Sequence, residues 1–143
     1  MKKKLILICA AVLMVFAILF GNHLYQKSIG NNDFKTVTII LNKEGEEFFR
    51  KEIPTTSGTL EELLIEARDS KELMLEYQDS EFGMYITGLG DEELYVNDDS
   101  EKLYWTYSSD NNKTCLKESY CPGASSLEIS DGDVFVFDYT KFE

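Results

Sequence analysis

The side chains best suited to contact a ligand in this sequence are aromatic, and several fall on one short segment. Residues 103–108 read LYWTYS, in which Trp105 and Tyr107 alternate with Tyr104. A strand with this pattern carries large rings on both faces. One face belongs to the core; the other either offers its rings to a flat ligand or a protein partner, or is itself covered by helix and loop. The candidate ligand-binding residues are Tyr85, Tyr104, Trp105, Tyr107 and Tyr120.

A second feature is the pair Cys115 and Cys121, which lies in a polar stretch. Outside the cytoplasm such a pair is most simply a disulfide, which would stiffen the loop, and two free thiols are the alternative. No metal site is expected, because the one histidine, His23, precedes the folded part and no further thiol completes a ligand set. The spacing is not Cys-x-x-Cys, so redox catalysis is not expected either.

Three acidic clusters separate the apolar segments: Asp91-Glu92-Glu93, Asp98-Asp99 and Asp131-Gly132-Asp133. Paired carboxylates can serve as acid–base dyads or as calcium ligands. However, the twelve-residue calcium-loop pattern is absent, and short polar side chains beside glycine are typical of turns, where they bond the backbone. The favoured interpretation is therefore structural turns, with calcium binding as the alternative.

Charge and composition exclude further classes of protein. The 143 residues contain 26 Asp and Glu against 14 Lys and Arg, a formal net charge of -12. Nucleic-acid binding is not expected, because it needs clustered Lys and Arg to displace counterions. With one histidine, and no spacing that pairs a nucleophile with a base, no catalytic site is expected, so the protein is predicted not to be an enzyme. The residues themselves imply no cofactor.

Residues 1–21 form a separate segment. Lys2, Lys3 and Lys4 are followed by an unbroken apolar run over residues 5–20, a pattern typical of an export signal or an N-terminal membrane anchor. The positive-inside rule sends the rest of the chain outward. Leu19 and Phe20 make a poor cleavage site, which favours an uncleaved anchor in the cell membrane. A cleaved signal peptide and a secreted protein are the alternative.

The exported part begins with a predicted tether, residues 22–34, and continues as one domain, residues 35–143. Once residues 1–21 are set aside, 11 Lys and Arg remain against 26 Asp and Glu, so this part has a formal charge of −15. The acids are dispersed over turns and a helix face, which indicates solubility rather than a catalytic or metal site.

The domain is predicted to combine strands with one helix. Thr59 and Glu62 form a Thr-x-x-Glu capping box ahead of an apolar stripe, which predicts a helix over 59–68. Residues 109–126 read as an irregular loop, and 54–58 as a break. The predicted strands are 35–42 and 47–53, joined by a hairpin turn at 43–46, then 83–89, 103–108 and 134–139, with 73–77 a short strand or helical turn. The fold class is α+β, a mixed sheet with one helix packed on a face.

Several short motifs occur together in a familiar order. Gly83-Met84-Tyr85-Ile86-Thr87-Gly88-Leu89, then Tyr104-Trp105-Thr106-Tyr107, Gly123-Ala124 and Asp131-Gly132-Asp133 resemble the transcobalamin C-terminal-like domain family. Family members are β-grasp modules, widespread in secreted and surface proteins of Gram-positive bacteria. The resemblance covers roughly Lys35 to Tyr139. It implies a β-grasp fold and, because the related domain of transcobalamin closes over cobalamin, a cobalamin-like corrinoid as the first candidate ligand.

These observations predict an extracytoplasmic, membrane-tethered and non-catalytic binding module for a small ligand. The aromatic strand and the cysteine loop are its expected binding surface. The alternative is a protein-interaction or structural domain of the cell envelope.

Overall fold

The computed structural model describes residues 9–17 and 34–142. They belong to two separate units, of which the second begins at Lys35. Residues 9–17 are helical and exposed. Within the described ranges no helix has both the length and the apolar character that a bilayer crossing requires. The rest of the predicted signal or anchor and nearly all of the predicted tether lie outside the described residues.

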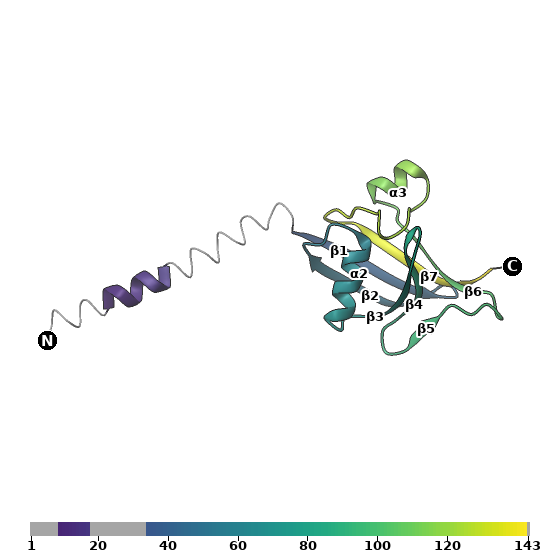
Figure 1. Cartoon of the computed structure of the whole chain (residues 1–143), viewed down its shortest axis with the longest axis horizontal. Helices are drawn as coiled ribbons and strands as arrows, with labels where there is room; N and C mark the ends of the chain where they lie inside the picture. Colours follow the sequence, from purple (N-terminus) through teal and green to yellow (C-terminus); the bar gives the residue numbers. More distant parts are fainter. Residues whose placement is uncertain (1–8, 18–33, 143) are drawn as a thin grey trace. The chain divides into compact units, whose positions relative to one another are not determined.

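The second unit is α+β, with two sheets (Figure 1). The first sheet has the order β2-β1-β7-β6, in which the central pair β1–β7 is parallel and the outer pairs are antiparallel. The second sheet, β3-β4-β5, is antiparallel throughout. The elements are β1 (Lys35–Lys43), β2 (Glu46–Thr55), α2 (Leu60–Asp69), β3 (Met74–Ser80), β4 (Gly83–Gly90), β5 (Leu94–Val96), β6 (Leu103–Ser108), α3 (Lys113–Glu118) and β7 (Val134–Lys141).

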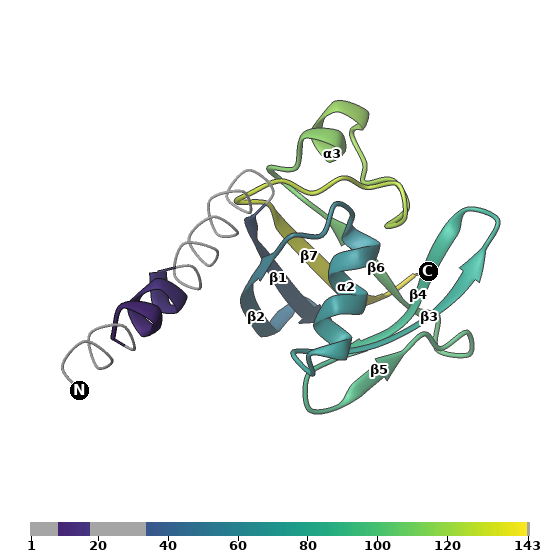
Figure 2. The same cartoon turned by 60° about the vertical axis from the view of Figure 1, so that its left-hand side comes forward.

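The core lies between the first sheet and α2, which crosses the strands in Figure 2. Alternate residues of the two central strands point toward the helix, and the apolar stripe of α2 meets them. Removing this apolar surface from water is the main force that holds the two layers together. The fully buried side chains include Val37, Ile39, Leu41, Leu60, Leu63, Leu64, Phe135 and Phe137.

The predicted helix is confirmed to within one residue, and its capping box is closed. The Thr59 hydroxyl accepts the amide of Glu62 at 3.3 Å. The Glu62 carboxylate accepts the amide of Gly58 at 2.9 Å, one residue ahead of the cap. One amide that α2 could not satisfy internally is thus bonded, and so is the amide of the residue that precedes the cap.

The prediction was wrong at three places. Strand β2 continues through Pro54, where a break was expected; β2 is an edge strand, and an edge strand tolerates a proline. The expected irregular loop over 109–126 contains α3. The single expected sheet is in fact two sheets. Strands β3, β4 and β5 pair with one another and not with the four strands of the first sheet.

Candidate functional site

Two of the predicted ligand-binding tyrosines lie together near the start of β6. The Tyr104 hydroxyl donates to the carboxylate of Asp99 at 2.8 Å, and this bond raises the pKa of Tyr104. The hydroxyl of Tyr85, whose ring is half exposed, accepts the side-chain amide of Asn97 at 3.3 Å. Both tyrosines therefore present polar, partly exposed rings at this end of the strand.

Trp105 lies on the opposite face of β6, in the core. Its indole Nε1 donates to the backbone carbonyl of Tyr95 at 2.7 Å, and its ring centroid lies 5.2 Å from that of Tyr139. The ring is buried. The strand therefore has one core face, carrying Trp105, and one half-exposed face, carrying Tyr104 beside Phe142 at 5.9 Å.

Tyr107 and Tyr120 lie at the other end of β6, with the cysteine loop. Tyr107 donates to the carbonyl of Pro122 at 2.7 Å, and burial raises the pKa of Tyr107 to about 12. The predicted disulfide Cys115–Cys121 is confirmed. Tyr120 is exposed, and together with both cysteines it lines a shallow cavity of about 390 Å³. Four of the five predicted residues thus form two pairs, one near each end of β6, and the fifth, Trp105, is buried between these ends.

A buried polar network, which the sequence did not reveal, holds the cysteine loop. The Asn112 side chain caps α3 by accepting the amides of Thr114 and Cys115, both at 3.0 Å. It also donates to the carboxylate of Asp133 at 2.8 Å, and that carboxylate accepts the amide of Ser130 at 2.8 Å. Asp131-Gly132-Asp133 is therefore a turn whose second acid joins the loop to β7.

The other acidic clusters also bond locally. Asp98 accepts the hydroxyl of Ser100 at 2.6 Å and the amides of Ser100 and Glu101, and these bonds lower the pKa of Asp98. Among residues 9–17 and 34–142, no group of three or more His, Cys, Asp or Glu side chains is arranged to hold a metal ion.

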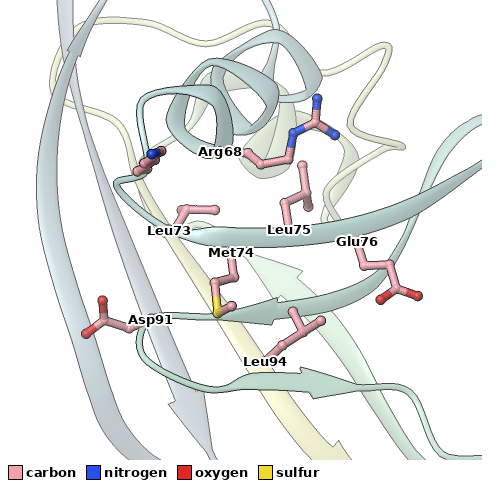
Figure 3. A pocket seen from close by; sticks show the side chains of 8 residues that line it. Arg68, Leu73, Met74, Leu75, Glu76, Asp91 and Leu94 are labelled. Carbon is pink, nitrogen blue, oxygen red and sulfur yellow. The ribbon is translucent and has the colours of Figure 1, made fainter.

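A cavity that the sequence did not predict lies along β3, away from the predicted aromatic residues. It has a volume of about 510 Å³. Figure 3 shows Arg68 reaching from α2 beside Leu75, while Met74 and Leu94 approach from β3 and β5. Successive residues of a strand point to opposite faces, so a lining that includes residues 73, 74 and 75 places the cavity along the edge of β3. Its lining is Arg68, Lys71, Leu73, Met74, Leu75, Glu76, Asp91 and Leu94.

Strand register brings two apolar residues of the cavity lining into one row. Gly90 of β4 lies between Met74 of β3 and Leu94 of β5 in one cross-strand row. A Cβ atom at Gly90 would lie 1.9 Å from the carbonyl oxygen of Glu93, so no side chain fits there. The backbone of residues 93–94 fills the space beside Gly90, so the row carries side chains only at its two ends, Met74 and Leu94. The sequence predicts only a bend at residues 88–91, because the register that aligns Gly90 with Met74 and Leu94 is a tertiary feature.

Charged groups lie around the apolar part of the cavity, which we call its floor and which comprises Leu73, Met74, Leu75 and Leu94. Arg68 is held by the carboxylate of Asp69, with Nη2 at 3.1 Å, and it lies over the ring of Tyr77 at 5.7 Å. Hydrogen bonding to Asp69 raises the pKa of Arg68, so the guanidinium stays charged. Glu76 and Asp91 supply acceptors on the same lining. The cavity can therefore hold an apolar group together with both hydrogen-bond donors and acceptors.

No protein-family model matches the sequence. No curated protein sequence matches it either.

Solved structures with a similar fold include a bacterial protein and part of haptocorrin. A protein from Ruminococcus gnavus, whose suggested role is metal binding, is 23% identical with a TM-score of 0.57, over 76% of this chain and 99% of that one. Haptocorrin in complex with Cbi is 14% identical with a TM-score of 0.60, over 77% of this chain. The match spans 26% of the haptocorrin chain. At these identities the likeness concerns the fold alone.

Proposed function

We propose that this chain is an extracytoplasmic, membrane-tethered and non-catalytic binding module of β-grasp type, and that it binds a small ligand. The main support for this proposal is the cavity along β3. The domain that contains it has a fold similar to part of haptocorrin, whose structure was solved with Cbi. Ligand cavities are commonly a few hundred Å³ or more, mainly apolar, with a few polar groups that fix orientation. The Arg68–Leu94 cavity has this composition.

A cobalamin-like corrinoid is the first candidate ligand. A corrin ring carries methyl groups and amide side chains around its edge. The methyl groups suit the floor of Leu73, Met74 and Leu94, while Arg68 can donate to amide oxygens and Glu76 can accept amide N–H groups. A corrinoid is larger than the cavity, so this domain would cover one side of it and leave the other for a second surface.

An extracytoplasmic location is supported by the disulfide Cys115–Cys121 and by the basic and apolar start of the sequence. The disulfide is the more direct of the two observations, because cytoplasmic reductants keep most paired thiols reduced. Labelling of free thiols in intact cells, with and without reductant, tests whether Cys115 and Cys121 are oxidised there. Both are expected to react only after reduction, and their labelling before reduction would contradict the extracytoplasmic location.

The ligand proposal is tested by isothermal titration of the full chain with cobinamide. Met74→Trp, which places a larger side chain in the lining of the β3 cavity, is expected to weaken binding at least tenfold, about the effect of losing one well-packed contact. Tyr120→Ser at the cysteine loop is the matched control and is expected to leave binding unchanged. Weaker binding by Tyr120→Ser and unchanged binding by Met74→Trp would place the site at the cysteine loop. If neither the parent nor any variant releases heat with cobinamide, the corrinoid proposal is wrong.

A specific observation also favours the alternative, an envelope protein-interaction domain. Phe82 is 86% exposed at the β3–β4 turn, and Leu116 and Tyr120 are exposed on the neighbouring disulfide loop. Exposed apolar side chains of this size are typical of protein contacts. Crosslinking in native membranes tests it: a partner captured by the parent and lost with Phe82→Ser would favour this function over small-ligand binding.

A further inference from the structure

A second surface of the domain has two aromatic rings in an acidic setting. Phe48 of β2 and Tyr95 of β5 meet edge to face, with centroids 5.4 Å apart. They form a shared wall between two cavities, one of about 380 Å³ and one of about 230 Å³. The wall continues inward through Tyr139, whose ring lies 5.8 Å from Tyr95, so the Tyr95 ring is fixed by core packing.

A β-bulge brings Phe48 to this position. Leu41 of β1 pairs with Phe49, while the next residue, Asn42, pairs with Glu47, so Phe48 is an extra residue in β2. A bulge redirects the side chain that it inserts. Here it turns Phe48 toward Tyr95, on the same side as the core residues.

The first cavity already contains a cation from the chain itself. The ammonium of Lys43 lies 4.3 Å from the centroid of the Tyr95 ring, and Lys43 lines the larger cavity with Glu44, Glu46 and Glu47. An ammonium over an aromatic face is attracted by the ring quadrupole. This side of the wall therefore shows which group the site accommodates: an alkyl chain that ends in a positive charge.

The second cavity has the same wall and no cation. It is lined by Phe48, Tyr95, Asp91, Glu92 and Glu93, so in this part of the described structure three acidic residues share the lining with the two rings, and no lysine or arginine does. Glu93 makes one long bond, accepting the Tyr95 hydroxyl at 3.4 Å. Two aromatic rings and three acids around an empty space match a cationic alkyl chain in both charge and shape.

We infer that the Phe48–Tyr95 wall is a binding site for an aliphatic polyamine, a ligand class separate from that of the β3 cavity. One ammonium lies in the cavity of residues 91–93, with its alkyl chain against Phe48. A further ammonium extends toward Glu44 and Glu46 and competes with Lys43 for the face of Tyr95. The Lys43 ammonium therefore resembles one end of the proposed ligand, and by occupying the face of Tyr95 it lowers the ligand's affinity.

Spermidine is the probe, titrated into the full chain at low ionic strength and followed by the amide resonance of Tyr95. Glu92→Gln/Glu93→Gln is expected to weaken binding about fivefold, since two exposed charge pairs are lost. The matched control, Asp79→Asn/Glu81→Gln at the β3–β4 turn, removes the same charge elsewhere and is expected to leave affinity within about twofold. Equal losses in the two double variants would mean diffuse attraction and would overturn the inference.

Two further variants separate the rings from the charge. Phe48→Ala keeps the net charge and is expected to weaken spermidine binding about threefold. Lys43→Met removes the internal competitor and is expected to strengthen binding by about the same factor. Unchanged affinity in both variants would contradict the site, as would displacement of spermidine by magnesium at matched ionic strength, because magnesium has no alkyl chain to lie on the rings.

This test is independent of the corrinoid test. The two cavities along the wall share only Asp91 with the β3 cavity, and neither double variant changes Asp91. Cobinamide binding is expected to persist in Glu92→Gln/Glu93→Gln, and spermidine binding in Met74→Trp. Failure of one proposal therefore leaves the other measurable.

Discussion

The acidic turns 131–133 and 91–93 have similar compositions but differ in burial and in hydrogen bonding. Asp133 is buried and accepts bonds from Asn112 and Ser130, and Asp131 accepts the amide of Thr36 at 2.8 Å. Residues 91–93 are all exposed, and they line a cavity together with two aromatic rings. The difference lies in the nearby donors: amides of the chain bond Asp131 and Asp133 and so stabilise the fold, whereas in the described structure no backbone amide donates to the side chains of residues 91–93.

The largest effect is expected at Asn112, the centre of the buried network around Asp133. Asn112→Ala is expected to lower the free energy of unfolding by about 3 kcal/mol, because it removes the α3 cap and leaves the Asp133 carboxylate short of a donor. Urea unfolding of the full chain measures it. Asn111→Ala, at an exposed neighbour that bonds Gly132 and Val134, is the control at about 1 kcal/mol. Equal losses would mean that burial of the network is unimportant.

The disulfide is the second support of the same loop. Cys115→Ser/Cys121→Ser is expected to cost about 2 kcal/mol, since the bridge closes a short ring and short rings restrict the unfolded chain least. Thermal unfolding of oxidised parent and double variant checks this. An unchanged melting temperature would show that the Asn112 network alone fixes the loop.

Tyr107 gives a pH test at the base of the loop. Burial raises its folded-state pKa to about 12, above the ordinary value of 10.0, so the folded state holds the phenol proton more tightly than the unfolded one. This contribution is complete below pH 10 and is lost as pH rises toward 12, by about 1 kcal/mol after allowance for partial solvent contact. Tyr107→Phe is expected to flatten this pH dependence of stability. A Tyr107 that titrates near 10 by ultraviolet absorbance would contradict the burial.

The smallest effect is expected at the exposed turn. Glu92→Gln/Glu93→Gln is expected to change the free energy of unfolding by less than about 0.5 kcal/mol, because neither carboxylate supports a buried group. Urea unfolding beside the Asn112 variant measures the contrast. A loss comparable to that of Asn112→Ala would show that residues 91–93 serve the fold.

Local patterns predicted the elements whose information is local. The capping box at Thr59 and the apolar stripe after it predicted α2. Alternation predicted β1 and β6, and β-prone residues predicted β7. Helix α3 was missed because six residues are too few to show a helical period; its one signal was Asn112, a good N-cap, which composition placed in a polar loop.

Both proposed sites depend on tertiary register, which local patterns do not contain. The β3 cavity needs Met74, Gly90 and Leu94 aligned across three strands, and the aromatic wall needs a bulge that turns Phe48 toward Tyr95. By contrast, the disulfide could be predicted, since a spacing and a compartment suffice. The predicted role of the five aromatic residues stays a prediction: the structure separates them into two groups and buries Trp105.

The parallel pair β1–β7 joins the first strand of the domain to the last, with Thr38 beside Val134. Contacts so distant in sequence form slowly, because a long loop must close before they contribute. The ribosome delivers β7 after the other strands of this domain, so before that point a nascent chain cannot fill the centre of its main sheet. Until that moment β1 lacks one of its two neighbours, and its apolar face lacks the rings of Phe135 and Phe137. Completion of the fold therefore depends on residues 134–141, and a product truncated before them would expose β1 to proteases and to other chains.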